Sequence, residues 1–407
     1  MSRDDSQLNK KRYFLIVFLL VNSLTWFLMV RRSIYIVLQG FDVTPQSYVI
    51  LWGIYDLAII ISGLIGAILS NKIERFTLFY LWIIIGIVFS VPFLFLSSLS
   101  SYFLAAILFG GILFGFGFGM PSCLAYFAEQ TFIENRGYTG GLIIFLTNAA
   151  APPIILIKDV TLCAIIAIIW RIMGFIMLFL MKPEKGNTVK KEKQQVSFRL
   201  ILNKNFILYF IPWLMFSLIY GFQRVILEQN IETGFFDFLR TLGAIFGTLS
   251  AIISGSISDR IGRKHVIIYG FISLGVAYAA VGIVPNNLFS LYLYSVIDGI
   301  AWGIFMLMFV LVLWGDLSHL DVKPAEKYYA LGSIPFFFGD FIGFLFSSYI
   351  WMPLSAAFSV ASFFLFLAVL PLMYAPETLP EKLIRRRELR KYVEKAKKIR
   401  EKYEAKD

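Results

Sequence analysis

Gly255-Ser-Ile-Ser-Asp-Arg-Ile-Gly-Arg-Lys264 is a short polar stretch between two long apolar runs of a 407-residue chain. Gly255 and Gly262 permit a sharp turn and a close approach of another backbone. The charged residues of the stretch are Asp259, Arg260, Arg263 and Lys264. In a chain that is 58% hydrophobic, both signs of charge in so few residues predict a tight polar loop at a membrane surface.

The composition of the chain also indicates a membrane protein. Only 15% of the residues are charged and the mean hydropathy is +0.76, which leaves too little polar surface to cover soluble cores. Apolar runs of about 20 residues, each long enough to span a bilayer, recur from Tyr13 to Tyr374. The two cysteines, Cys123 and Cys163, lie inside such runs without CxxC spacing, so we expect no disulfide framework, metal site or cofactor.

The apolar runs predict an all-α membrane protein with twelve transmembrane helices. They cover residues 13–38, 46–70, 77–97, 101–127, 138–157, 160–181, 205–229, 233–256, 265–284, 287–314, 328–350 and 354–375. With an even number of spans, both termini lie on one side of the membrane. Placing the termini and every second loop in the cytoplasm puts 31 of the 37 Lys and Arg residues there, as the positive-inside rule requires. The net charge of +11 therefore indicates orientation in a bilayer, and we expect no nucleic-acid partner.

The two halves of the chain repeat each other at a nearly constant offset. Asn71–Arg75 corresponds to Asp259–Arg263, 188 residues later, and Arg136-Gly-Tyr138 corresponds to Lys327-Tyr-Tyr329, 191 residues later. We therefore predict a first six-helix bundle, a cytoplasmic linker, a second six-helix bundle and a basic tail at residues 1–183, 184–204, 205–376 and 377–407. The apolar residues of the tail recur at helical spacing, which indicates an amphipathic helix on the anionic leaflet or, alternatively, a solvated charged tail.

The spacing GxxxDRxGRK at 255–264 resembles the signature loop of the major facilitator superfamily, which joins the second and third helices of each six-helix half. Glu129 with Arg136-Gly137 resembles the loop after the fourth helix of that family. Pro376-Glu-Thr378 resembles the ending of its sugar and organic-ion branches. The resemblance implies two six-helix bundles, a solute site between them and transport by alternating access.

The resemblance also implies a gate. In the family the acidic residue of the loop pairs with neighbouring cytoplasmic helix ends and holds the inner side closed, so Asp259 is expected to be the latch, with Arg260 and Arg263 as partners. The gating motif is then Gly255, Asp259, Arg260, Gly262, Arg263 and Lys264. The first-half copy has Asn71 in place of the acid, so we expect the chain to rely on its second half. A plain positive-inside loop is the alternative.

Charged residues inside the predicted spans are functional candidates, because each costs roughly 2.5–3.5 kcal/mol at a helix centre on insertion scales. Arg32 and Arg224 lie in the first helix of each half, 192 residues apart, and Tyr220 shares the stripe of Arg224. Family members that exchange organophosphates for phosphate carry one arginine on each of these helices. The resemblance therefore implies an anion clamp, because guanidinium groups suit phosphate and carboxylate. Alternatively, Arg32 snorkels outward and Glu228 neutralises Arg224.

Asp298 is the first candidate for proton coupling. It lies near the middle of its span on a stripe with Tyr294 and Trp302, which complete the predicted solute-binding residues. A buried carboxylate near an arginine can take up and release a proton as a cavity opens to each side. The alternative is a structural ion pair with an arginine such as Arg224 or Arg32.

Asp340 and Asp56 lie at similar depth and are further candidates for proton coupling. His265 and His319 both fall in predicted cytoplasmic loops, so a carboxylate must carry any proton across the membrane. Arg171 lies at the centre of a span that is peripheral in the family, and nothing in the sequence accounts for it.

Taken together, the sequence favours a secondary active transporter of a small organic, phosphorylated or carboxylated anion, coupled to protons and acting as a monomer in the plasma membrane. A proton-linked sugar or drug carrier, with structural arginines, is the alternative within transport. A membrane receptor or scaffold on the same fold is the alternative outside it. We expect no enzyme, because no Ser/His, HExxH or Asp-rich constellation occurs at membrane depth. We expect no ATP-driven pump, because the sequence lacks GxxxxGK followed by Ser or Thr.

Overall fold

The computed structural model describes residues 3–39, 45–98, 102–181, 203–347 and 352–380, together with Leu389. The first half contains α1 (Arg3–Gln39), α2 (Pro45–Leu69), α3 (Arg75–Ser90), the 3-10 helix η1 (Val91–Ser98), α4 (Tyr102–Gln130), α5 (Arg136–Ala149), α6 (Ala151–Leu156) and α7 (Val160–Met181). The second half contains α8 (Lys204–Asn230), α9 (Thr233–Ile261), α10 (Arg263–Ile283), α11 (Leu288–Phe305), the π-helix η3 (Met306–Val312), α12 (Leu313–Leu320), α13 (Ala325–Gly332), α14 (Ile334–Ser347) and α15 (Leu354–Tyr374).

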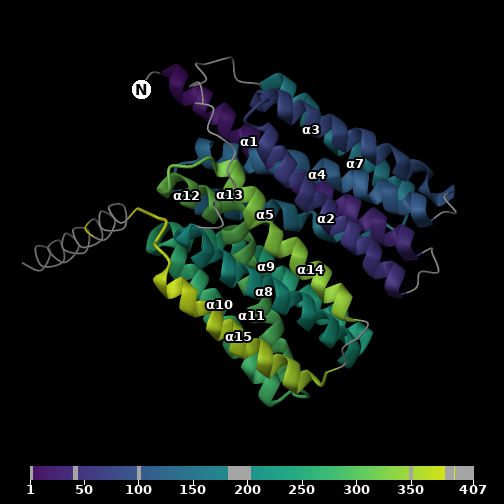
Figure 1. The fold of residues 1–407 in the computed structure, drawn as a ribbon, viewed down its shortest axis with the longest axis vertical. Helices are drawn as coiled ribbons and strands as arrows, with labels where there is room; N and C mark the ends of the chain where they lie inside the picture. Colours follow the sequence, from purple (N-terminus) through teal and green to yellow (C-terminus); the bar gives the residue numbers. More distant parts are fainter. Residues whose placement is uncertain are drawn as a thin grey trace, which may run out of the picture.

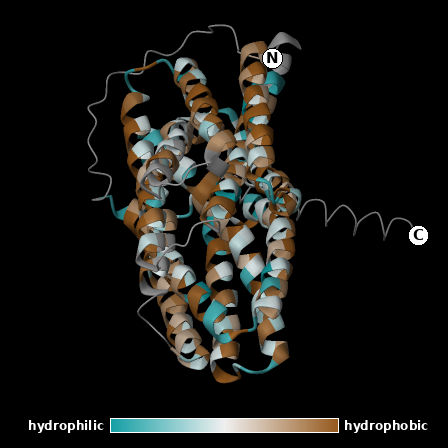
Figure 2. Cartoon of the chain, turned by 90° about the vertical axis from the view of Figure 1, so that its right-hand side faces the viewer, coloured by the Kyte–Doolittle hydropathy of each residue, from teal (hydrophilic) through white to brown (hydrophobic). Residues whose placement is uncertain are grey.

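The prediction of an all-α membrane protein is confirmed. Within the described ranges, eleven helical stretches are long and apolar enough to cross a membrane. The predicted span 328–350 corresponds to α13 and α14, which are separated at Ser333. Apolar residues predominate along the long helices (Figure 2). Many of their large side chains are exposed, as they must be where lipid is the solvent. Examples are Ile84, Val88, Phe179, Leu180, Tyr269 and Phe363.

The prediction of a ten-residue polar loop at Gly255–Lys264 is wrong. α9 continues to Ile261 and α10 begins at Arg263, so only Gly262 is non-helical between them. Gly262 has φ 106°, a left-handed conformation that glycine adopts without steric cost, and it ends α9. Asp259 is only 5% exposed, because it faces the other half of the chain. The polar residues of the motif therefore make a contact between helices.

The two halves form two bundles that lie side by side (Figure 1). α1, α2, α3, α4 and α7 gather in one bundle, and α8, α9, α10, α11 and α15 gather in the other. Several helix pairs join them: α5 packs against α9, α14 packs against α2, and α13 packs against α4. Most of the linker 184–204 and of the tail 377–407 lies outside the described residues, so the proposed domain limits and the amphipathic tail stay predictions.

Parts of α1 and of the segment after α15 lie close to the motif. The hydroxyl groups of Tyr13 on α1 and Thr139 on α5 are 3.0 Å apart, which places the first third of α1 beside the start of α5. Glu377, just after α15, contacts the start of α10. We call this end of the molecule, where residues 131–135, 262 and 321–324 connect the helices, the motif end.

Candidate functional site

The two halves touch backbone to backbone where α5 begins and α9 ends. A Cβ atom added to Gly137 would lie 2.6 Å from the carbonyl oxygen of Gly255 and 2.6 Å from the hydroxyl oxygen of Ser258. One turn along α5, a Cβ atom added to Gly141 would lie 2.9 Å from the Cα atom of Ile252. Only residues without a side chain permit this approach. We call this contact the α5–α9 seam.

Asp259 crosses the α5–α9 seam with both carboxylate oxygens. Oδ1 accepts the backbone N–H of Gly137 at 2.9 Å, and Oδ2 accepts that of Tyr138 at 2.8 Å. These N–H groups belong to the first turn of α5, which has no intrahelical acceptors for them and where the helix dipole favours an anion. Asp259 also accepts from Arg263 Nη1 at 2.5 Å. Arg260, the other expected partner, has an exposed side chain.

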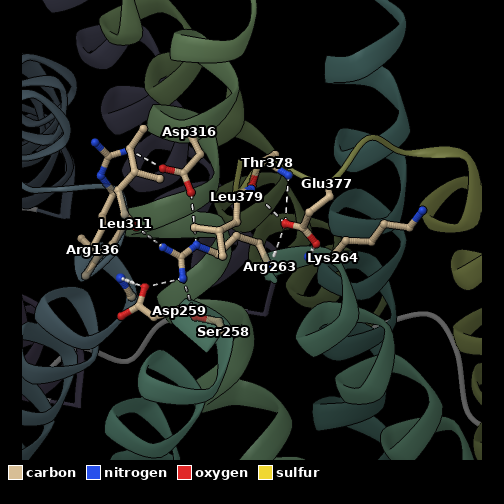
Figure 3. Close-up of polar contacts among 12 residues, drawn as sticks. Arg136, Ser258, Asp259, Arg263, Lys264, Leu311, Asp316, Glu377, Thr378 and Leu379 are labelled. Carbon is tan, nitrogen blue, oxygen red and sulfur yellow. Dashed lines mark hydrogen bonds and ion pairs between the residues drawn. The ribbon is translucent and has the colours of Figure 1, made fainter. Parts of the chain in front are cut away.

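Asp316 on α12 joins arginines from both halves (Figure 3). Its Oδ1 accepts from Arg136 of α5, and its Oδ2 accepts from Arg263 Nε at 3.2 Å. Arg263 also donates from Nη2 to the carbonyl oxygen of Ile133 in the first half, at 2.9 Å. With Asp259 these side chains form a buried cluster of two acids and two arginines. We call Asp259, Arg263, Asp316 and Arg136 the lock.

Glu377 holds the break between α9 and α10 in place. Its Oε1 accepts the N–H of Arg263 at 2.8 Å and its Oε2 accepts the N–H of Lys264 at 3.1 Å, so it caps α10 (Figure 3). Gly262 leaves room for this carboxylate, because a Cβ atom there would lie 2.8 Å from Glu377 Cδ. Lys264 donates from Nζ to the carbonyl oxygen of Met373 at 2.8 Å. The motif residues after the break are thus tied to the end of α15.

The first-half copy of the motif also reaches across the halves. Arg75, at the start of α3, donates to both carboxylate oxygens of Glu129 in its own half. It donates at 3.1 Å to Glu326 of α13 in the other half. Asn71, which stands in the place of the motif's acid, has an exposed side chain. The first-half copy, which lacks the acid of the motif, therefore joins the halves through Arg75 instead.

Predicted site residues also come together between α8 and α11. Tyr220 packs edge-on against Trp302, with ring centroids 4.3 Å apart, and Gln223 donates to the Tyr294 hydroxyl at 2.7 Å. Asp298 lies on α11 four residues from both Tyr294 and Trp302. Its Oδ1 is buried and accepts no hydrogen bond within the described part of the chain. We call Tyr220, Gln223, Tyr294, Asp298 and Trp302 the α8–α11 group.

The two arginines of the proposed anion clamp are both half-buried. Arg32 donates from Nε to the carbonyl oxygen of Ile157 at 3.0 Å, and its guanidinium carbon lies 5.6 Å from the ring centre of Tyr35. Arg224 follows Gln223 on α8. Among the residues that the structure describes, Arg32 forms no hydrogen bond or ion pair with the α8–α11 group. The structure thus holds Arg32 beside the connection between α6 and α7.

The remaining candidates for proton coupling lie on α2 and α14. Asp56 is 2% exposed and follows Tyr55, whose ring centre lies 4.8 Å from that of Trp52. Arg31 turns toward the same helix, with its guanidinium carbon 5.5 Å from the ring centre of Trp52. Asp340 belongs to α14, and its side chain lies outside the part that the structure describes.

Arg171 receives the explanation that the sequence lacks. It is fully buried on α7, and its guanidinium carbon lies 5.0 Å from the ring centre of Trp26 and 4.5 Å from that of Trp82. Nη1 donates to Asn22 Oδ1 at 3.2 Å and to the Ser23 hydroxyl at 2.6 Å. No carboxylate pairs with it among the described residues. Two indole faces and two side-chain acceptors therefore hold this cation in the first bundle.

The residues that complete the lock and its first-half counterpart were missed as functional residues in the sequence. They are Arg75, Glu129, Arg136, Asp316, Glu326 and Glu377. The repeat carried a signal for some of them, because Asp316 follows Glu129 by 187 residues and Arg263 follows Arg75 by 188. Gln223 carried no such signal. Within the described ranges, no three His, Cys, Asp or Glu side chains are placed to hold a metal ion.

Neither a protein-family model nor a curated protein sequence matches the chain. Solved structures do match it. A bacterial homologue of the iron transporter ferroportin, in the outward-facing state, has a TM-score of 0.67 at 14% identity, over 90% of this chain and 98% of that one. The human organic anion transporter TETRAN has a TM-score of 0.65 at 14% identity, over 89% and 99%. The E. coli fucose:proton symporter has a TM-score of 0.69 at 11% identity, over 90% and 99%.

Proposed function

We propose that this chain, which has the fold of the major facilitator superfamily, is a secondary active transporter that moves a small solute by alternating access. The observation that carries the proposal is the pair of hydrogen bonds from the first turn of α5 to Asp259 of the other half. Alternating access requires a contact of this kind, which closes one end of the molecule in one state and is absent in the other.

The composition of the lock suits a contact that must both form and break. Its two acids and two arginines carry no net charge, and the side chains of Arg136, Arg263 and Asp316 are at most 1% exposed. The attraction within a buried ion pair is offset by the loss of hydration, so the intact cluster stabilises the closed state only modestly. Removal of one partner, in contrast, leaves a buried charge uncompensated, at a cost of about 3–5 kcal/mol.

The positive-inside rule supports a cytoplasmic location for the motif end. We further propose that the chain is a multi-pass monomer of the plasma membrane. The conformation described is then closed to the cytoplasm. Two of the matching structures are named as outward-facing, namely the ferroportin homologue and a second structure of the fucose symporter, which has a TM-score of 0.71 at 10% identity. A transporter that faces outward is closed to the cytoplasm, which supports the same assignment here.

A small organic anion is the solute class that we propose first. Arg32 uses Nε for the carbonyl of Ile157 and lies near the ring of Tyr35, which holds the guanidinium group. Within the described part of the chain its terminal nitrogens have no acceptor, so they can bind a solute oxygen. Arg224 is the corresponding arginine on α8, 192 residues later. Two guanidinium groups match the paired oxygens of phosphate or carboxylate. The organic anion transporter among the matching structures supports this class.

Protons are the proposed coupling ion, and Asp298 is the proposed carrier. Its Oδ1 is buried without a hydrogen-bond partner in the described part of the chain. This carboxylate therefore has a site in which the protonated form is tolerated. Asp56 and Asp340 stand as further candidates on α2 and α14.

A hydroxylated solute such as a sugar is the second candidate, and the α8–α11 group favours it. Tyr220 and Trp302 offer aromatic surface, and Asp298 offers an acceptor for hydroxyl groups. The fucose:proton symporter among the matching structures supports this class. An amphiphilic cation would use the same aromatic surface and carboxylate, which is the drug-carrier alternative.

Reconstitution in liposomes with an imposed pH gradient tests the proposal. Labelled organic anions, sugars and amphiphilic cations are offered in turn to the wild type, to Arg32→Ala and to Arg224→Ala. If the wild type takes up an anion and both variants do not, the anion clamp is supported. If the wild type and both variants all take up a neutral solute, the anion clamp is ruled out. Absence of uptake for every solute would favour the receptor or scaffold alternative.

A further inference from the structure

The acid and the amide of the motif exchange places between the two copies of the repeat. In the second copy, Asp259 lies on α9 and Asn135 precedes α5 across the seam. In the first copy, Asn71 follows α2 and Glu326 lies in the first turn of α13 across the halves. Glu326 is the repeat mate of Asn135, 191 residues later. The first copy therefore lacks an acid at Asn71 in the first half but has one, Glu326, in the facing second half.

The charges around the two copies also differ in arrangement. In the second copy, Asp316 lies between two arginines, one from each half, and Arg263 also pairs with Asp259. In the first copy, one arginine, Arg75, lies between two acids, Glu129 from its own half and Glu326 from the other. Each copy thus has a central charge that is shared across the halves.

The position of Glu326 favours a charged carboxylate. It is in the first turn of α13, where the helix dipole stabilises an anion, and Pro324 at the N-cap supplies no side-chain acceptor to that turn. The residue is 2% exposed, whereas the side chain of Arg75 is 19% exposed. Burial strengthens the attraction between the two groups.

We propose that Glu326 is the latch acid of the first-half copy of the motif, acting on Arg75 in place of the acid that Asn71 lacks. This inference rests on the proposed alternating access, because a latch has a role only if the motif end opens. It makes Glu326 a positioning residue of the gate, without contact to the solute. The motif end is then closed by one latch acid for each copy of the motif, Asp259 for the second copy and Glu326 for the first.

The test measures the distance across the first copy in full-length protein in nanodiscs, with Cys123 and Cys163 replaced by alanine. Spin labels are attached at Lys72 and Lys323, which are both exposed. We expect Glu326→Gln to raise the ratio of open to closed distances about fivefold or more, the usual size of a coupling between sites. Adding Asn71→Asp in the same chain should restore the wild-type ratio, because the acid returns to the other side of the contact.

Glu74→Gln is the matched control, because Glu74 is an exposed acid next to Arg75 that accepts from Thr77 in its own half. It should leave the ratio unchanged. Glu326→Asp keeps the charge but shortens the side chain, so it should raise the ratio less than Glu326→Gln. It replaces Glu326→Gln as the test variant if the glutamine side chain disturbs folding.

An unchanged ratio in Glu326→Gln, or a failure of Asn71→Asp to restore it, would overturn the inference. The distances are measured without solute, so a negative transport assay leaves this result standing. Conversely, if Glu326→Gln transports normally and its distance is unchanged, Glu326 is not a latch, but the proposed transport function still stands.

Discussion

Gly137 of α5 and Gly255 of α9 meet with their backbones in contact, although they belong to opposite halves of the chain. Asp259 lies one turn after Gly255 on α9, and its carboxylate accepts the N–H of Gly137. The contact of Asp259 with α5 can therefore form only while the two helices approach without a side chain between them. Closure of the α5–α9 seam and formation of this contact are one event.

Gly137→Ala is expected to open the α5–α9 seam. The added methyl group would lie 2.6 Å from the carbonyl oxygen of Gly255, and backbone on both sides prevents relief by a rotamer change. Spin labels at Phe132 and Ile261, both exposed, should then report a longer distance. Gly234→Ala is the control, because a Cβ atom there meets nothing within 4 Å. Equal distances in both variants would show that the seam adjusts without opening.

Asp259→Asn is expected to slow transport more than Asn71→Asp alters it. The amide keeps one acceptor oxygen for the first turn of α5 but loses the charge that pairs with Arg263. A charge-assisted hydrogen bond is about twice as strong as a neutral one, so the latch weakens without disappearing. Initial rates in proteoliposomes measure both variants. Small and equal effects would reduce the motif to an orientation signal.

Asp316→Asn is expected to destabilise the closed state by about 3–5 kcal/mol, because Arg136 and Arg263 would then share fewer negative charges while buried. The labelled pair across the α5–α9 seam should report mostly open distances, and the thermal midpoint of the purified protein should fall. Asp237→Asn removes an exposed acid that pairs with Arg240 at 3.9 Å, and it should change neither quantity. A closed seam in Asp316→Asn would mean that the seam holds without the ion pairs of Asp316.

The sequence predicts the helices well because apolar runs of membrane length are a local signal. It fails at the motif, where α9 extends through residues that look like a loop, because their burial depends on α5, more than 100 residues earlier in the chain. Asp316 was missed for the same reason. It follows the predicted span 287–314 and looks like a solvated residue until Arg136 and Arg263 are placed beside it. The repeat relates Asp316 to Glu129, but it does not show which residue of the other half either acid contacts.

Arg171→Met is expected to leave the fold intact, whereas Arg171→Glu should prevent folding. The arginine has no acid partner among the described residues, so its removal leaves no buried charge behind, and methionine fills the space between Trp26 and Trp82 with favourable sulfur–aromatic contacts. A glutamate in the same place would be a buried anion facing two ring faces. Size-exclusion profiles and thermal midpoints distinguish the variants. Loss of transport in a fully stable Arg171→Met would give this cation a role beyond packing.

Asp298→Asn is expected to abolish proton-driven accumulation of solute while leaving exchange of labelled for unlabelled solute. Oδ1 of Asp298 and Nε1 of Trp302 are both buried without hydrogen-bond partners in the described part of the chain. An amide of the same shape preserves the packing of the α8–α11 group, so solute can still bind and the halves can still alternate. It cannot gain or lose a proton, so a pH gradient no longer drives uptake. Gradient-driven uptake and counterflow are measured in the same proteoliposomes, with the exposed Asp237→Asn as control. Accumulation that persists in Asp298→Asn would exclude Asp298 as the carrier and direct the same pair of assays to Asp56 and Asp340.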